Sequence, residues 1–148
     1  MKILFVGTIG LITRDRVKGR RLFASNLRLP LRHLKGTDFV FTDRLQGSRY
    51  FGVWPLSEAA KACLGKSRWP KNRPVPQAFV EFEVASPARV FAAAVELRSK
   101  GISLLHPAKK DPWGQTVVRF QTDDGLIVGI SFVPWMHPKK HTSKPRRR

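Results

Sequence analysis

Two glutamates in one segment are the clearest candidates for chemistry in this chain. Strict alternation places Phe79, Glu81 and Glu83 on one face of a predicted strand. A carboxylate held among aromatic side chains has a raised pKa and can act as a general base without a metal. Glu81 is therefore the first candidate for a catalytic residue. The alternative is a solvated strand face whose charges pair with Arg49 or Arg119.

The other side chains that could bind metals or act as nucleophiles are scattered. The four histidines show no short ligand spacing; they are His33, His106, His137 and His141. Cys63 is the single cysteine, so an internal disulfide and a zinc finger are both excluded. Its neighbours include no basic partner, and we expect a buried, inert thiol in a reducing compartment.

A large positive charge dominates the composition. The 148 residues include 28 Lys and Arg against 10 Asp and Glu, a net charge of +18, while 42% apolar residues argue against extended disorder. The basic residues concentrate between Arg14 and Lys35 and in the tail 137–148, which we expect to be disordered. Such a field attracts polyanions whatever the fold. Polyanion or nucleic-acid binding is thus one alternative function, and an incidental contact is another.

The N-terminal apolar run needs a separate interpretation. Met1 and Lys2 followed by residues 3–12 resemble the start of a signal peptide, but Arg14 follows at once and no small-residue cleavage site is present. The run is also about half the roughly 20 residues that a membrane-spanning helix needs. We expect a buried strand, no membrane contact and a cytoplasmic protein.

The elements that must position the glutamates form a series of strand, helix and strands that occurs twice. The first series has a strand at 3–13, a helix at 14–27 and short strands near 31–34, 38–42 and 49–54. The second has a strand at 78–84, a helix from 87 to Gly101 with Ser86 as its N-cap, and strands near 102–105, 115–121 and 126–133. An additional helix is predicted at 57–64. We therefore expect a single domain at 1–136, made of βαβββ modules 1–68 and 78–136 joined by the proline-rich segment 69–77.

The order of these pieces resembles the vicinal oxygen chelate superfamily, which includes glyoxalase I, bleomycin-resistance proteins and extradiol dioxygenases. The resemblance rests on residues 10–15, 27–31 and 51–56 in the first module and on 81–84, 112–115 and 123–127 in the second. It implies an α+β fold in which two modules curve around a cavity. Arg28 stands where the family often has glycine at the end of the first helix. If that turn is kept, arginine takes a left-handed backbone at a cost on the order of 1 kcal/mol.

In this family the cavity commonly holds a divalent metal on the first and fourth strands of each module. Carried over to this chain, the ligand positions fall on or beside Thr8, on Phe51 with Tyr50 beside it, and on Phe79 and Gly129. None of these is a good ligand, because divalent metals of this class need imidazole or carboxylate donors. We therefore expect no metal and no cofactor.

The expected cavity lining then decides the function. The family's cavity faces correspond here to Arg49, Phe51 and Phe79, with Glu81 and Glu83, while Trp54 and Trp113 would add stacking surfaces near the mouth. The tryptophans could instead close a core or a dimer contact. An aromatic pocket with a few charges suits a small amphipathic ligand.

The function thus has two main interpretations. The first is a glyoxalase/bleomycin-resistance-like protein that binds a small molecule without metal, as a homodimer by analogy with the family. The second is an enzyme, either a glyoxalase-like lyase or isomerase or a metal-independent proton-transfer catalyst that uses Glu81. The sequence does not decide whether the protein is an enzyme.

Overall fold

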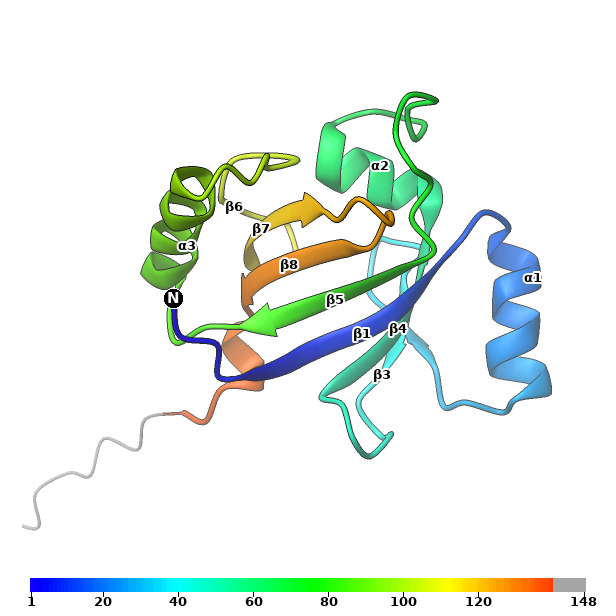
Figure 1. Ribbon diagram of the computed structural model, residues 1–148. Coiled ribbons are helices and arrows are strands. Elements are labelled where there is room, and N and C mark those ends of the chain that lie inside the picture. The colour runs from blue at the N-terminus through cyan, green and yellow to red at the C-terminus, as the bar shows by residue number, and fades with distance from the viewer. Residues whose placement is uncertain (140–148) are drawn as a thin grey trace, which may run out of the picture.

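A single curved sheet of eight strands organises the protein, whose computed structural model describes residues 1–139 (Figure 1). The strand order is β2-β3-β4-β1-β5-β8-β7-β6. The strands of the first half are β1 (Phe5–Thr13), β2 (Arg32–His33), β3 (Val40–Thr42) and β4 (Tyr50–Pro55). Those of the second half are β5 (Ala78–Glu83), β6 (Lys109–Lys110), β7 (Thr116–Gln121) and β8 (Ile127–Phe132). The predicted α+β class is confirmed.

The pairing pattern is the same in both halves, as expected of two βαβββ modules. Within each module the first and fourth strands are parallel, β1 with β4 and β5 with β8. The two modules meet where β1 and β5 run antiparallel at the middle of the sheet. Corresponding positions of the two modules therefore lie in neighbouring strands.

The first helix begins at Arg16, two residues after the predicted start, and then changes its geometry. Helix α1 (Arg16–Arg20) is capped by Asp15, whose carboxylate accepts hydrogen bonds from the N–H groups of Val17 and Lys18. It continues directly as a π-helix, η1 (Arg21–Asn26). Arg28 then takes φ = 55°, the left-handed backbone expected if the turn of the family is kept.

The other two helices follow the sequence signals closely. Helix α2 (Leu56–Leu64) ends at Gly65, which has φ = 66°, and α3 (Pro87–Ser99) begins with Ser86 accepting a hydrogen bond from the N–H of Arg89. In Figure 1, α3 lies on the left beside the second module and α1 on the right beside the first, whereas α2 lies above the sheet.

Two apolar clusters hold α3 and α2 on the sheet. One packs α3 against the outer face of the second module, with Val90, Leu97, Val118 and Ile130 buried. The other packs α2 against the inner face through Trp54, Phe79 and Ile127, and it encloses Cys63 completely. The buried thiol agrees with the sequence prediction, and burial raises its pKa to about 11. The inner cluster closes one end of the concave face.

Two segments differ from the sequence predictions. Residues 102–105 form no strand but a single bridge from Leu104 to Phe120, and the second strand of the module is instead β6, a few residues later. The predicted tail begins at His137, but this ring stacks on Phe132 with the centroids 4.6 Å apart. A short 3-10 helix, η2 (Pro134–Met136), leads into it. His141 and the rest of the tail from 140 lie outside the described residues.

Within residues 1–139 no helix combines the length and the apolar character needed to cross a membrane.

Candidate functional site

A cavity of about 900 Å³ opens on the concave face of the sheet. Its floor is formed by Thr8 of β1, Tyr50 and Trp54 of β4, and Phe79 and Glu81 of β5. Its rim comprises the turn 34–37, one side of α2, the loop 109–113 and residues 133–136. The paired modules therefore enclose a hollow, as the resemblance implied.

Strand register aligns four residues across the floor of the cavity. Thr8 pairs with Tyr50 on one side and with Glu81 on the other, and Glu81 pairs with Gly129. These are the first-strand and fourth-strand positions of both modules. Glu81, rather than the expected Phe79, occupies the first-strand position of the second module, where the family commonly has a metal ligand. Gly129 leaves room for the glutamate, because a Cβ there would lie 3.0 Å from Glu81 Cγ.

This row of residues does not fit a divalent metal. Glycine contributes no side-chain donor, threonine and tyrosine hydroxyls are neutral at physiological pH, and only Glu81 supplies a carboxylate. Within residues 1–139 no three His, Cys, Asp or Glu side chains cluster closely enough to hold an ion. The floor of the cavity therefore lacks the donors that a catalytic divalent ion needs.

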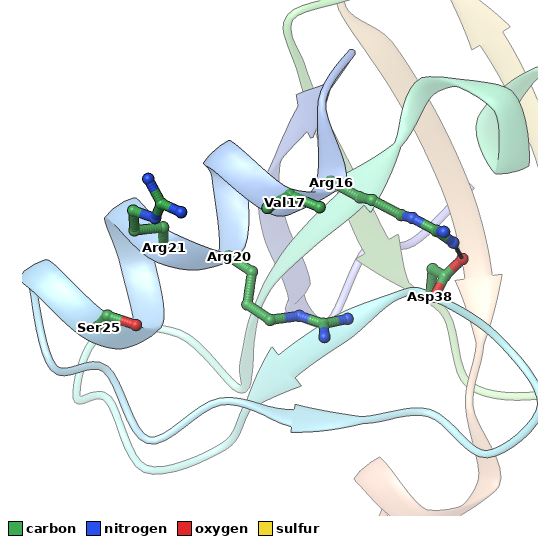
Figure 2. A pocket seen from close by; sticks show the side chains of 6 residues that line it. All are labelled: Arg16, Val17, Arg20, Arg21, Ser25 and Asp38. Atoms are coloured by element: carbon green, nitrogen blue, oxygen red, sulfur yellow. Dashed lines mark hydrogen bonds and ion pairs between the residues drawn. The ribbon is translucent and has the colours of Figure 1, made fainter.

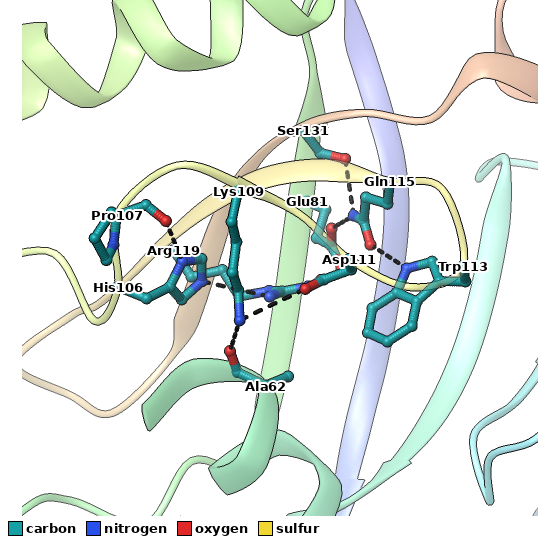
Figure 3. Close-up of polar contacts among 10 residues, drawn as sticks. All are labelled: Ala62, Glu81, His106, Pro107, Lys109, Asp111, Trp113, Gln115, Arg119 and Ser131. Carbon is teal, nitrogen blue, oxygen red and sulfur yellow. Dashed lines mark hydrogen bonds and ion pairs between the residues drawn. The ribbon is translucent and has the colours of Figure 1, made fainter. Parts of the chain in front are cut away.

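Glu81 is held in place by side chains of the second module (Figure 3). The Gln115 amide donates to its Oε2 and also to Ser131 Oγ at 2.8 Å, while Trp113 Nε1 donates to Gln115 Oε1 at 2.8 Å. Glu81 Oε1 has no hydrogen-bond partner within the described chain. Gln115 thus fixes one carboxylate oxygen of Glu81, and the other accepts no hydrogen bond from the described residues.

Burial governs the protonation of Glu81. Desolvation raises the pKa of this carboxyl group, and the charge of Glu83 adds to the rise. The Arg119 guanidinium and the Gln115 amide act in the opposite direction without cancelling the effect. Glu81 therefore combines the two properties of a candidate general base, a free oxygen and a raised pKa.

A buried ion cluster stands beside Glu81. Arg119, which is only 1% exposed, donates to Asp111 Oδ2 at 3.1 Å, and Lys109 Nζ lies 3.5 Å from Asp111 Oδ1. Lys109 also donates to the Ala62 carbonyl at 2.6 Å, which ties the loop to α2 (Figure 3). Arg119 Nε is sealed from solvent with no partner within the described chain. This cluster fixes the loop that carries Trp113 and Gln115.

His106 completes the cluster as a neutral side chain. Desolvation, reinforced by the charges of Arg119 and Lys109, lowers its pKa to about 4. Its Nδ1 lies 2.7 Å from the Pro107 carbonyl, so Nδ1 carries the proton and donates there. Nε2 is then free to accept from Arg119 Nη1 at 3.4 Å.

The first module supplies an aromatic wall, which we define as Phe39, Phe41, Tyr50 and Trp54. Phe41 stacks on Tyr50 with centroids 5.0 Å apart, and Phe39 stacks on Phe41 at 5.9 Å. Trp54 meets Phe79 edge to face at 5.3 Å and carries Arg119 over its ring. This wall offers flat apolar surface to a ligand.

The structure places four of the predicted site residues on the cavity, Glu81, Phe79, Trp54 and Trp113. Arg49 and Phe51 do not line it, so their expected place is wrong by one residue. Thr8 pairs with Tyr50, which puts Tyr50 on the concave face and turns Phe51 toward Phe23 of η1. The Arg49 guanidinium lies instead over the ring of Phe5. The side chains of β4 do alternate between the two faces of the sheet, but the residues predicted on the cavity face lie on the opposite face.

Glu83, which was expected to bind the ligand, does not line the cavity. It is completely buried, accepts from the N–H of Val133 at 2.8 Å, and lies 2.9 Å from His137 Nε2. These contacts hold the segment that carries Trp135 and Met136 against the cavity. No hydrogen bond joins the Glu81 and Glu83 carboxylates within the described residues.

Sequence reasoning missed most of the polar wall, which we define as Glu81, Lys109, Asp111, Gln115 and Arg119. Arg119 was considered only as a partner of the glutamates. On β7 it pairs with Gly129, the neighbour of Glu81, so its side chain faces the cavity. Asp111 and Lys109 carry no such signal, because they follow a loop whose path no periodicity predicts.

A second, shallower pocket of about 420 Å³ lies beside α1 (Figure 2). Arg16, Arg20, Arg21 and Ser25 line it, with Asp38 opposite. Arg16 pairs with Asp38, and Arg20 Nη2 lies 2.6 Å from His33 Nε2. Its exposed arginines form part of the basic surface that the sequence indicated, but no aromatic wall accompanies them.

Comparisons with known proteins address the fold. No family model matches the sequence, and no curated protein matches it. Among solved structures, a glyoxalase/bleomycin resistance protein/dioxygenase superfamily member from Vibrio splendidus is similar, with 17% identity, a TM-score of 0.50, and coverage of 88% of this chain and 98% of that one. A methylmalonyl-CoA epimerase variant from Streptomyces coelicolor has 15% identity, a TM-score of 0.56 and coverage of 88% and 97%.

A further similar structure is described as an NAD-dependent benzaldehyde dehydrogenase from Legionella pneumophila, with 14% identity, a TM-score of 0.56 and coverage of 84% and 96%. Identities this low report on architecture alone. Together with the paired βαβββ modules, they give this protein the fold of the vicinal oxygen chelate superfamily, that of the glyoxalase/bleomycin-resistance-like proteins.

Proposed function

We propose that this protein binds a small amphipathic molecule in the cavity without a metal. The observation that carries the proposal is the floor of the cavity, where the row Thr8, Tyr50, Glu81 and Gly129 lacks a ligand set for an ion. The aromatic wall and a few fixed polar groups around about 900 Å³ are typical of small-molecule sites.

The test is to fill the cavity and measure binding of a neutral apolar probe, N-phenyl-1-naphthylamine, by its fluorescence. Thr8→Phe adds a ring on the cavity floor, whereas Ile9→Phe adds the same ring on the opposite face, where Ile9 is 44% exposed. We expect one site per chain, lost in Thr8→Phe and kept in Ile9→Phe. Equal binding by both variants, or none by the unmodified protein, would refute the proposal.

Proton transfer by Glu81 is the second candidate function. It is supported by the free Oε1 atom and by the raised pKa of this carboxyl group. A base of this kind removes a proton from a carbon acid bound against the aromatic wall, and Gln115 keeps the carboxylate oriented meanwhile.

A chromogenic carbon acid, 5-nitrobenzisoxazole, tests this candidate. Loss of its C3 proton to the carboxylate breaks the ring N–O bond and releases a coloured cyanonitrophenolate. We expect the rate to rise with pH through a pKa above 4.5 and to fall to background in Glu81→Gln. A rate at background in the unmodified protein would leave binding as the only proposed function.

The homodimer and the polyanion contact expected from the sequence remain predictions. Sedimentation at several salt concentrations addresses the first, and salt-dependent retention on a polyanion matrix addresses the second.

A further inference from the structure

The charges that line the cavity are unequal in number. Five basic side chains face it, namely Arg32, Lys35, Lys61, Lys109 and Arg119, against three carboxylates, Glu58, Glu81 and Asp111. A neutral ligand gains nothing from such an excess of cations. The positions of the cations without ion-pair partners therefore indicate whether the ligand carries a negative charge.

Three of the five cations already have carboxylate partners. Arg32 Nη2 lies 3.0 Å from Asp43 Oδ2, and both Lys109 and Arg119 share Asp111. The inner end of the cavity is thus occupied by ion pairs formed within the protein, and an anionic ligand group there would compete with Asp111.

The two remaining cations stand at the rim. Lys35 in the turn 34–37 and Lys61 on α2 are both exposed and have no carboxylate partner within residues 1–139. The segments that carry them are joined, because Glu58 Oε1 accepts a hydrogen bond from the N–H of Asp38 at 2.6 Å. The rim therefore presents two ammonium groups without an ion-pair partner in the described residues, next to the aromatic wall, while the Glu58 carboxylate on α2 accepts from the N–H of Asp38.

We propose that the ligand is an organic anion, with an aromatic or other apolar body against the aromatic wall and a carboxylate, sulfonate or phosphate at Lys35 and Lys61. This inference rests on the proposed function, since it assigns the ligand class of the same cavity. A single anionic group at one end of an apolar body matches this arrangement of charge and apolar surface. It also distinguishes the cavity from the arginine pocket beside α1, which lacks an aromatic wall.

Two probes that share an aromatic body test the inference. 8-Anilinonaphthalene-1-sulfonate carries one sulfonate, and N-phenyl-1-naphthylamine is its neutral counterpart. Both are titrated into the full chain, into Lys35→Gln/Lys61→Gln, and into Lys66→Gln/Lys71→Gln. The last variant removes the same charge from exposed lysines that do not line the cavity.

We expect the sulfonate to bind more tightly than the neutral probe, and its affinity to fall about tenfold in Lys35→Gln/Lys61→Gln. The neutral probe should change less than about twofold in that variant, and Lys66→Gln/Lys71→Gln should leave both affinities unchanged. The salt dependence of sulfonate binding should also diminish only in the rim variant.

The outcomes separate this inference from the proposed function. Sulfonate affinity that is unchanged in the rim variant, or reduced equally in the control, overturns the inference, while continued binding of the neutral probe preserves the proposed function. Failure of both probes to bind the unmodified chain overturns both.

Discussion

The two modules contribute opposite kinds of surface to one cavity. The aromatic wall of the first module consists of rings that contact each other and offer apolar area. The polar wall of the second consists of groups that are hydrogen-bonded or ion-paired to one another, all of them buried except Lys109. The same βαβββ topology thus serves two purposes, and the difference lies in the side chains on the concave face. The aromatic wall is suited to contact a ligand, and the polar wall is suited to hold the loop at 109–113 in place.

The polar wall should be far more sensitive to truncation, and Asp111→Ala tests this most severely. It leaves Arg119 buried without a carboxylate, which typically costs about 3–5 kcal/mol of unfolding free energy. Urea denaturation measures the loss. Asp111→Ala/Arg119→Met, which removes both charges, should recover most of it. A double variant as unstable as the single one would show that the charges are not the cause.

Glu81→Gln should change stability in a pH-dependent way. Because folding raises the pKa of Glu81 above its ordinary value of 4.5, the unfolded chain ionises first and the native protein loses stability as pH rises from 4.5 to the folded pKa. Glutamine does not titrate. The advantage of the variant should therefore grow across that window by up to about 1.4 kcal/mol per pH unit and then stay constant.

Glu96 provides a control of opposite sign. Hydrogen bonds from the N-terminal ammonium and from Lys100 lower its pKa to about 2. Its contribution is present above the unfolded pKa and is lost as pH falls toward the folded value. Glu96→Gln should therefore be the less stable protein above pH 4.5, and the two proteins should converge in acid. The same sign for both glutamates would contradict the assignment of their surroundings.

The aromatic wall should show the smallest effect on folding. Tyr50→Ala removes a ring that stacks on Phe41, worth about 0.5–1.5 kcal/mol beyond its buried area. Binding of N-phenyl-1-naphthylamine should weaken roughly five- to tenfold, which corresponds to about 1–1.4 kcal/mol. Fluorescence titration and denaturation of the same preparation give both numbers. A large loss of stability with unchanged binding would reverse the roles of the two walls.

Local signals predicted the frame of the molecule well. The N-cap at Ser86 and the left-handed Gly101 that follows α3 depend on a few neighbouring residues, and both are present, whereas the left-handed Arg28 was one of two alternatives that the family resemblance left open. The strand at 102–105 failed because a short edge element depends on its partner more than on its own composition.

The site was less predictable for a related reason. Alternation shows which residues share a face but not which face is concave, so Phe51 was assigned in place of Tyr50. Asp111 and Lys109 reach the cavity through contacts with Arg119 and Ala62, far away in the sequence. Glu81 was predicted correctly because the cavity face that the family resemblance implies for β5 is the face that carries Phe79 and Glu81.

The central claim is that the cavity binds its ligand without an ion. Its most direct test is a titration of N-phenyl-1-naphthylamine into protein extracted with EDTA, repeated after separate addition of Mg²⁺, Mn²⁺, Ni²⁺ and Zn²⁺. We expect one site per chain with the same affinity in every titration. Binding that appears only when one of these ions is restored would contradict it.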